Sequence, residues 1–138
     1  MNDVVADTHA IVWYLFDPGR LSLAADTALT AAAQSARIFV STITLVEVNY
    51  LTGKKTFPYT GALPRLYSLL ADPAQSLKAL PVDLAVAQAL DQVPRAEVPD
   101  MPDRIVAATA VAHHLPLVSV DSDIQGSASL KALIQVIW

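Results

Sequence analysis

The sequence predicts an α/β fold in which a mostly parallel sheet of about five strands carries helices on both faces. Short apolar segments typical of buried strands alternate with segments of helical periodicity along the chain. The chain has 138 residues, 54% of them hydrophobic, which is enough for one substantial core. No internal repeat, low-complexity segment or linker divides it. We therefore expect a single domain over residues 1–138.

The first elements follow from apolar runs and the breaks between them. A short buried strand is expected at residues 3–7, followed by a helix over 9–16. The run Asp17-Pro18-Gly19 stops that helix, because proline and glycine interrupt regular structure. Ser22 is a good N-cap for an Ala-rich helix that continues to about residue 34.

The middle of the chain continues the alternation. The segment RIFVS, 37–41, is expected to be the second strand, and TLVEVNYLTGKK a helix that ends near Gly53. A helix follows from about residue 63 to 70, and its apolar face consists of Leu63, Leu66, Tyr67 and Leu70. The segment LKALPV, 77–82, is a candidate third strand.

The last third begins with Asp83, which caps the helix LAVAQALDQV. Residues 94–102 contain three prolines and form a loop. Pro102 suits the first turn of a helix that runs to about residue 114. The fourth and fifth strands are LPLVSVD, 115–121, and LIQVIW, 133–138.

Composition and charge argue against several classes of protein. No apolar stretch approaches the roughly 20 residues that span a bilayer, so we expect no membrane association. The start of the chain lacks a signal-peptide pattern, and there is no cysteine for a disulfide or a thiolate metal site. A cytoplasmic location is the simplest interpretation. The net charge of −4 does not by itself indicate a nucleic-acid-binding protein, because phosphate contacts usually bring a basic excess.

Carboxylates occur where the predicted strands end, which is where open parallel sheets bind ligands. Asp7 ends the first strand, and Asp121 ends the fourth, with Asp123 two residues later. Glu47 lies about one turn into the helix that follows the second strand. Asp103 lies in the first turn of the helix before the fourth strand, so it reaches the same edge only if the proline-rich loop carries the helix start around.

These acids would make a metal site if folding gathered them into one pocket. Four neighbouring carboxylates repel one another strongly, and a divalent cation relieves that repulsion. Ligation by oxygen alone suits Mg²⁺ or Mn²⁺ better than Zn²⁺. Such an ion lowers the pKa of bound water and neutralises charge on a phosphoryl group, which would allow an acidic protein to act on a polyanion.

At these acids the chain resembles a known family. The segments VVADTHAIVWYLF, STITLVEVNYL and PDMPDRIVAATAVAHHLPLVSVD are similar to successive motifs of the PIN-domain nucleases. More narrowly, they resemble the VapC-type toxins of bacterial toxin–antitoxin pairs. The similarity runs from Val4 to about Asp123 and is weak over residues 54–95.

The resemblance implies a PIN-like nuclease domain that hydrolyses RNA phosphodiesters with a metal-activated water, using Mg²⁺ or Mn²⁺. The positions that match the family's acidic metal ligands are Asp7, Glu47, Asp103 and Asp121. Asp123 could share or replace the role of Asp121. The hydroxyl residues that match pocket-lining positions are Thr8, Ser41 and Ser119. The implied partners are an RNA substrate, a small cognate antitoxin that covers the site, and a second copy of the chain in a homodimer.

Each acid near the first two strands also has a structural explanation. Asp7 could be the N-cap of the first helix, although Thr8 could serve equally. The spacing from Thr44 to Glu47 is that of a capping box, unless the helix begins further back at Ser41 or Thr42. These alternatives stay open on sequence alone.

The later acids and the basic residues have structural alternatives as well. Asp103 would be stabilised by the helix dipole, with Asp100 as a competing N-cap, and Asp121 and Asp123 favour turns. Arg104 could contact phosphate or simply be solvated. Lys54 and Lys55 could contact RNA or form a solvated loop after Gly53.

His9 and an aromatic group in the first helix are further candidates for the site. His9, two residues after Asp7, could line the pocket, although a structural role is favoured. The aromatic group Trp13, Tyr14 and Phe16 is more typical of core or interface than of a base-stacking platform.

Three rival functions are consistent with a small α/β fold. The first is a PIN-like domain that no longer cleaves and only binds RNA or protein; the intact acid set argues against it. The second is a phospho-accepting receiver domain, which needs an acceptor Asp and a later Lys that the strand ends here lack. The third is a DNA 5′-nuclease, for whose extra acids and helical arch 138 residues leave little room.

Overall fold

The computed structural model describes residues 2–138 and contains a five-stranded sheet in which every neighbouring pair of strands is parallel. The spatial order is β3-β2-β1-β4-β5, so the first strand lies at the centre. The strands are β1 (Val4–Ala6), β2 (Ile38–Ser41), β3 (Leu77–Leu80), β4 (Leu117–Val118) and β5 (Val136–Ile137). The predicted parallel α/β fold is therefore confirmed.

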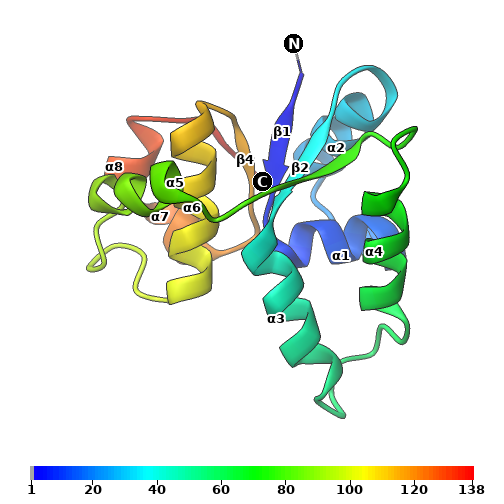
Figure 1. The fold of residues 1–138 in the computed structure, drawn as a ribbon. Coiled ribbons are helices and arrows are strands. Elements are labelled where there is room, and N and C mark those ends of the chain that lie inside the picture. Colours follow the sequence, from blue (N-terminus) through cyan, green and yellow to red (C-terminus); the bar gives the residue numbers. More distant parts are fainter. Residues whose placement is uncertain (1) are drawn as a thin grey trace.

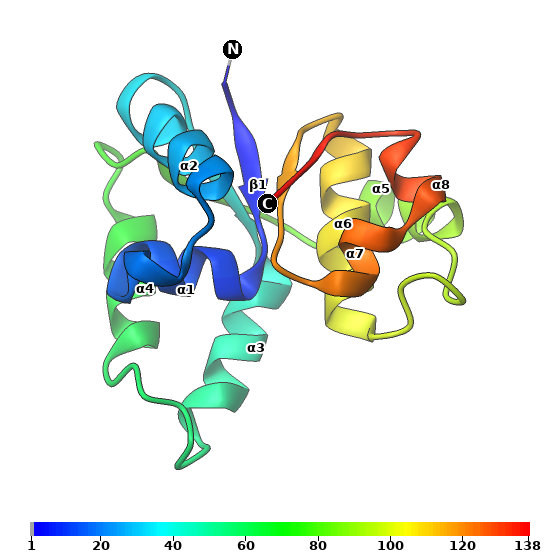
Figure 2. The same ribbon diagram turned by 180° about the vertical axis from the view of Figure 1, so that it is seen from behind.

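Helices cover both faces of this sheet (Figures 1 and 2). On one side lie α1 (Thr8–Phe16), α2 (Leu23–Ser35), α3 (Thr42–Thr52) and α4 (Ala62–Ala71). On the other lie α5 (Leu84–Ala89), α6 (Met101–His113), α7 (Ser122–Gly126) and α8 (Ala128–Lys131). Two 3₁₀ turns, η1 (Pro18–Arg20) and η2 (Leu90–Gln92), follow α1 and α5. Within residues 2–138, no helix has both the length and the apolarity needed to cross a membrane.

The sheet separates two hydrophobic cores, and β1 contributes to both. Val4 and Ala6 pack with α1, α2 and α4, whereas Val5 packs with α5 and α6 on the opposite face. This is the period-two alternation of a strand. All three side chains are buried, as expected for a central parallel strand covered by helices on both sides.

Short polar side chains begin most of the helices. Ser22 and Asp83 accept hydrogen bonds from the first turns of α2 and α5, which confirms both predicted caps. Ser41 caps α3 by accepting from the Ile43 N–H, so the capping box that would have started this helix at Thr44 is wrong. Thr44 is buried instead.

Two local expectations differ from the structure. On α4, Leu63, Leu66 and Leu70 pack against the core as expected, whereas Tyr67 is 50% exposed and Leu69 is buried in its place. The segment after β4 forms two short helices, α7 and α8, that the sequence pattern did not indicate. Both are under eight residues long and bury one leucine or isoleucine each, too little for a recognisable helical period.

The segment between η2 and α6 returns the chain to the carboxyl edge of the sheet. Its conformation is held by Arg104, whose Nε and Nη2 donate to the carbonyl oxygens of Val93 and Leu90 at 2.6 and 2.7 Å. Glu97 in the same segment accepts hydrogen bonds from Ser127 and Ser129 around the start of α8. The start of α6 is therefore fixed to two other parts of the same side of the sheet.

Candidate active site

A pocket of about 450 Å³ lies beyond the carboxyl ends of β1 and β4. Its lining residues are Asp7, His9, Trp13, Glu47, Asp100, Asp103, Val120 and Asp121. The four acids singled out in the sequence thus lie together, although they come from the start of the chain, α3, α6 and the end of β4. The proline-rich loop does carry Asp103 around to this edge.

Asp7 is the most firmly held of these carboxylates. Its Oδ1 accepts from the Ala10 N–H at 2.7 Å, which caps α1, and its Oδ2 accepts from the Val120 N–H at 3.1 Å. Burial raises the pKa of this carboxyl, while the Ser119 hydroxyl and the two backbone N–H groups lower it. Capping the helix and lining the pocket are therefore compatible, and the expectation that Thr8 could take over the cap was wrong.

Thr8 instead orients Glu47. The Thr8 hydroxyl donates to Glu47 Oε1 and lies 3.1 Å from the Thr44 hydroxyl. Burial raises the pKa of Glu47, and the neighbouring carboxylates of Asp100 and Asp7 raise it further. The Glu47 side chain is therefore aimed at the other acids rather than back at its own helix terminus.

Asp103 lies at the electrostatic centre of the pocket. Burial, together with the charges of Asp121, Asp100, Glu47 and Asp7, raises the pKa of Asp103 to about 8. The shift combines the burial of this carboxyl with the repulsion of the four carboxylates around it. The geometry thus produces the mutual repulsion that a bound divalent ion would relieve.

Asp100, expected from the sequence only as a possible helix cap, is also a site residue. Its Oδ2 does accept from the Asp103 N–H at 3.3 Å and caps α6. It also lies in the pocket, and carboxylate oxygens of Glu47, Asp100 and Asp103 lie within 4.8 Å of one another. The spacing of two acids three residues apart at a helix start was a usable signal, because both then project from the same turn.

Of the other predicted pocket residues, some lie at the pocket and others do not. Ser119 is buried and accepts from the Asp121 N–H, and Asp121 caps α7 through the Ile124 N–H. Asp123 is exposed and is not among the residues that line the pocket, so Asp121 is the acid that β4 delivers there. Ser41 is fully buried at its cap position and does not line the pocket either.

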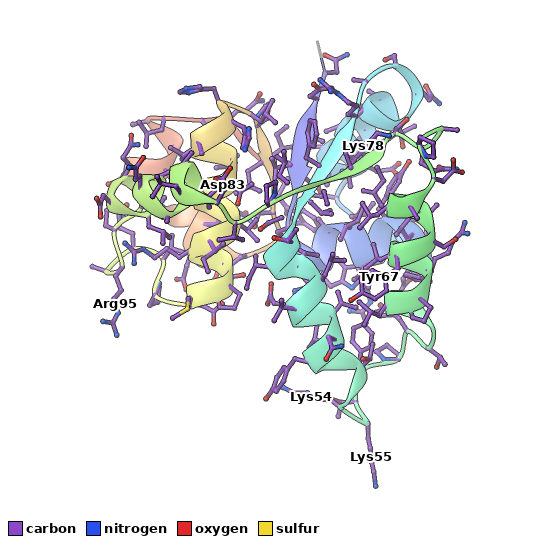
Figure 3. All side chains as sticks on the ribbon, in the orientation of Figure 1. Lys54, Lys55, Tyr67, Lys78, Asp83 and Arg95 are labelled. Atoms are coloured by element: carbon purple, nitrogen blue, oxygen red, sulfur yellow. The ribbon has the colours of Figure 1, made fainter. Side chains whose placement is uncertain are left out.

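The basic candidates lie outside the acid pocket. The Arg104 guanidinium is directed at Val93 and Leu90, which favours a structural role over a phosphate contact. Lys54 and Lys55 lie in the segment after α3, where Lys55 projects away from the body of the molecule (Figure 3). Lys54 is exposed but lines a neighbouring groove, and His9 lines both that groove and the acid pocket.

The pocket offers carboxylate oxygens and no sulfur ligand, which is the donor set of a hard divalent cation. Asp7 is rigid and Glu47 is oriented by a hydroxyl, so these two side chains are already positioned without an ion. Asp100 and Asp103 are less buried than Asp7, and Asp100 Oδ2 accepts a single long hydrogen bond of 3.3 Å from the Asp103 N–H, so both side chains can adjust more readily than that of Asp7. The residues present therefore fit a divalent metal.

Comparison with known proteins points to one family. Residues 4–128 match the PIN domain. Ribonuclease VapC22 of Mycobacterium tuberculosis is 31% identical over 121 residues, which is 88% of each chain.

Solved structures of toxin–antitoxin complexes contain similar chains. VapBC2 from Rickettsia felis bound to a promoter DNA fragment matches with a TM-score of 0.67 and 16% identity, over 99% of both chains. DNA-bound VapBC from Salmonella typhimurium matches with a TM-score of 0.68 and 19% identity, over 99% of this chain and 97% of that one. At these identities the likeness is one of fold.

Proposed function

The chain belongs to the PIN-domain family, and we propose that it is a metal-dependent endoribonuclease that acts as the toxin of a bacterial toxin–antitoxin pair. One observation carries the proposal: carboxylates from four separate parts of the chain share one pocket, in a protein 31% identical to a named ribonuclease over most of its length.

We assign the metal ligands to Asp7, Glu47, Asp103 and Asp121, with Asp100 as an additional carboxylate, and the ion to Mg²⁺ or Mn²⁺. When bound, such an ion supplies positive charge for a developing phosphorane and lowers the pKa of water. The absence of a thiolate and the crowding of carboxylates both support this choice over Zn²⁺.

The protein's own residues have separable tasks in this mechanism. Asp7 keeps its position because two backbone N–H groups hold its two oxygens. Thr8 holds Glu47 toward the scissile phosphate, and Ser119 supports both Asp7 and the turn that carries Asp121. With water as the nucleophile, the products would carry 5′-phosphate and 3′-hydroxyl ends.

The proposed partners follow from the relatives. The solved neighbours are VapBC toxin–antitoxin assemblies, which supports a small cognate antitoxin, and the 31% identical relative is a ribonuclease, which supports an RNA substrate. A homodimer and a cytoplasmic location complete the proposal. A short neighbouring gene for a DNA-binding protein with a disordered tail would support the toxin assignment, because such tails fold on binding.

The test is cleavage of a panel of structured RNAs by the purified protein. We expect cleavage with Mg²⁺ or Mn²⁺, its loss in EDTA and its return when the metal is restored, with 5′-phosphorylated fragments. Ends bearing 2′,3′-cyclic phosphate would exclude water as the nucleophile. If RNA is bound but not cleaved under any metal, the alternative of an inactive RNA- or protein-binding domain is correct.

A further inference from the structure

A second groove, of about 380 Å³, adjoins the acid pocket and shares two of its lining residues, His9 and Trp13. The groove is lined by His9, Trp13, Arg20, Leu51, Lys54, Thr56, Phe57, Pro58 and Tyr59. Its lining residues come from α1, the turn after it, the end of α3 and the segment that leads to α4, and Figure 1 shows where these elements lie. The family resemblance is weak over residues 54–95, and of the residues on this wall only Lys54 was predicted as a possible RNA contact.

Both helices continue from the acid pocket into this groove. On α1, His9 and Trp13 are four residues apart and lie one above the other on the same face. On the opposite wall, Glu47 lines the pocket, while Leu51 and Lys54 line the groove. Within α3, Glu47 and Leu51 are four residues apart, about 6 Å at the helical rise per residue, and Lys54 follows the end of the helix. A strand whose phosphate lies at the carboxylates can therefore extend directly into the groove.

The charge changes sign along this path. The pocket end carries the acids, whereas Arg20 and Lys54, both exposed, lie at the far end. Asp17 is the acid that faces them, and its ion pair with Arg20, at 3.2 Å, is solvent-exposed and therefore weak. Two cations at the end of a groove suit the phosphate of a polyanion that also reaches the metal site.

Aromatic rings lie between these two ends. Trp13 is half-buried, with its ring centroid 5.7 Å from that of His9 and 6.0 Å from that of Trp138. On the other wall Phe57 and Tyr59 pack edge to face at 5.3 Å, and the Tyr59 hydroxyl donates to Asp17 at 2.9 Å. The groove walls are thus tied together before any ligand binds.

We propose that this groove is the subsite for an unpaired nucleotide beside the scissile phosphate of single-stranded RNA. Its base stacks on Trp13 in place of the Arg20 guanidinium, which lies over the Trp13 ring at 5.5 Å from the centroid, and Arg20 and Lys54 then contact its phosphate. Rings combined with cations along a groove are the features that bind single strands with little sequence preference, and a base held in a duplex cannot reach the Trp13 face. This inference rests on the proposed function, because the acid pocket must hold the scissile phosphate.

The test is binding, so that it does not depend on cleavage. Fluorescence anisotropy of a short labelled RNA is measured with Ca²⁺ in place of Mg²⁺, using single-stranded and duplex forms of the same length. We expect Trp13→Ala to weaken single-strand binding about tenfold, since base stacking contributes ~1–3 kcal/mol, and Trp13→Phe to retain most of the affinity. Circular dichroism melting checks that each variant is folded.

A double variant tests the cations, which are both exposed, so that neither substitution removes a buried side chain. Arg20→Ala with Lys54→Ala should weaken binding and reduce the salt slope by about 0.7, because both cations contact the same phosphate and one phosphate contact to a single strand contributes about 0.7. Lys131→Ala, an exposed lysine on α8, is the matched control and should change neither quantity. In Trp138→Phe, Trp13 is the sole tryptophan, and stacking should quench its emission.

The outcomes separate this proposal from the enzymatic one. Equal affinity of the wild type, Trp13→Ala and the double variant for RNA overturns the subsite and leaves the groove to a protein partner. Equal affinity for single-stranded and duplex RNA overturns it as well. Metal-dependent cleavage together with either result leaves the nuclease function standing, whereas groove-dependent binding without cleavage under any metal would overturn the nuclease function alone.

Discussion

The two sides of the acid pocket are built differently. Asp7 leaves the central strand and is held by backbone N–H groups on both oxygens, so its position depends on contacts with α1 and the turn after β4. Asp100 and Asp103 are carried by α6, whose start depends on the long segment fixed by Arg104 and Glu97. Asp7 is therefore anchored in the sheet, whereas the positions of Asp100 and Asp103 depend on the loop that supports them.

The largest difference in activity is expected between variants that remove one carboxylate charge from each side of the pocket. Asp7→Asn is expected to reduce kcat/KM by at least about a hundredfold, because it removes a rigid ligand of an ion that contributes several kcal/mol. Asp100→Asn, at an exposed position with freer rotamers, should cost much less. Asparagine is also a good N-cap, so α1 should persist in Asp7→Asn.

These rates are measured on one RNA at saturating Mg²⁺, with Asp26→Asn on α2 as the control for loss of an acid outside the pocket. Equal losses in Asp7→Asn and Asp100→Asn would contradict the contrast between an anchored and an adjustable carboxylate.

The supporting loop can be weakened without touching an acid. Arg104→Ala removes two charge-assisted hydrogen bonds to carbonyl groups and should lower the free energy of unfolding by about 2 kcal/mol. Arg104→Lys should restore little of this free energy of unfolding, because an ammonium group cannot make the two hydrogen bonds of the guanidinium group in the same geometry. Urea unfolding measures the loss.

The same variant distinguishes the two roles considered for Arg104. If its role is structural, the salt dependence of RNA binding is unchanged in Arg104→Ala, even as amide exchange in residues 93–100 becomes faster. A reduced salt slope with unchanged stability would instead assign Arg104 to a phosphate.

Metal-free protein should show a pH dependence that arises from the carboxyl groups of the acid pocket. The pKa of Asp103 is raised to about 8, so its carboxyl keeps a proton in the folded chain that the unfolded chain has lost. Its contribution to stability is complete below about pH 4, where both states are protonated, and is lost as the pH rises toward 8. The raised pKa values of Asp7 and Glu47 act in the same direction.

We therefore expect the Tm in EDTA to fall between about pH 5 and pH 8, and Mg²⁺ to raise it most at the upper end. Asp103→Asn should flatten this profile. A Tm in EDTA that stays level or climbs over this range would show that the carboxylates do not repel one another in the folded chain.

The smallest effect is expected at the end of β4. Asp123→Asn should leave metal-dependent activity nearly unchanged, because this side chain is exposed and does not line the pocket. Asp121→Asn should lower activity clearly, as Asp121 lines the pocket and its charge raises the pKa of Asp103. The paired variants are compared in the same cleavage assay; a reversed order would make Asp123 the fourth ligand.

Much of the fold was predictable because its signals are local. The alternation of strands and helices, the stop after Phe16 and the caps at Ser22 and Asp83 each depend on neighbours within a few residues. The choice of Ser41 as the cap of α3, the exposure of Tyr67 on α4 and the two short helices after β4 were not predictable in the same way. There, several polar residues could serve as caps, or too few apolar residues existed to define a face.

The amino-acid sequence was sufficient to predict the parallel α/β architecture and the position of Asp7 at a strand end, because apolar periodicity and capping act over short distances. Long-range packing was needed to show that α6 starts beside Asp7, that Asp100 joins the cluster, and that Arg104 holds the loop rather than lining the pocket. Those outcomes depend on contacts between segments far apart in the chain, whose geometry no short-range pattern records.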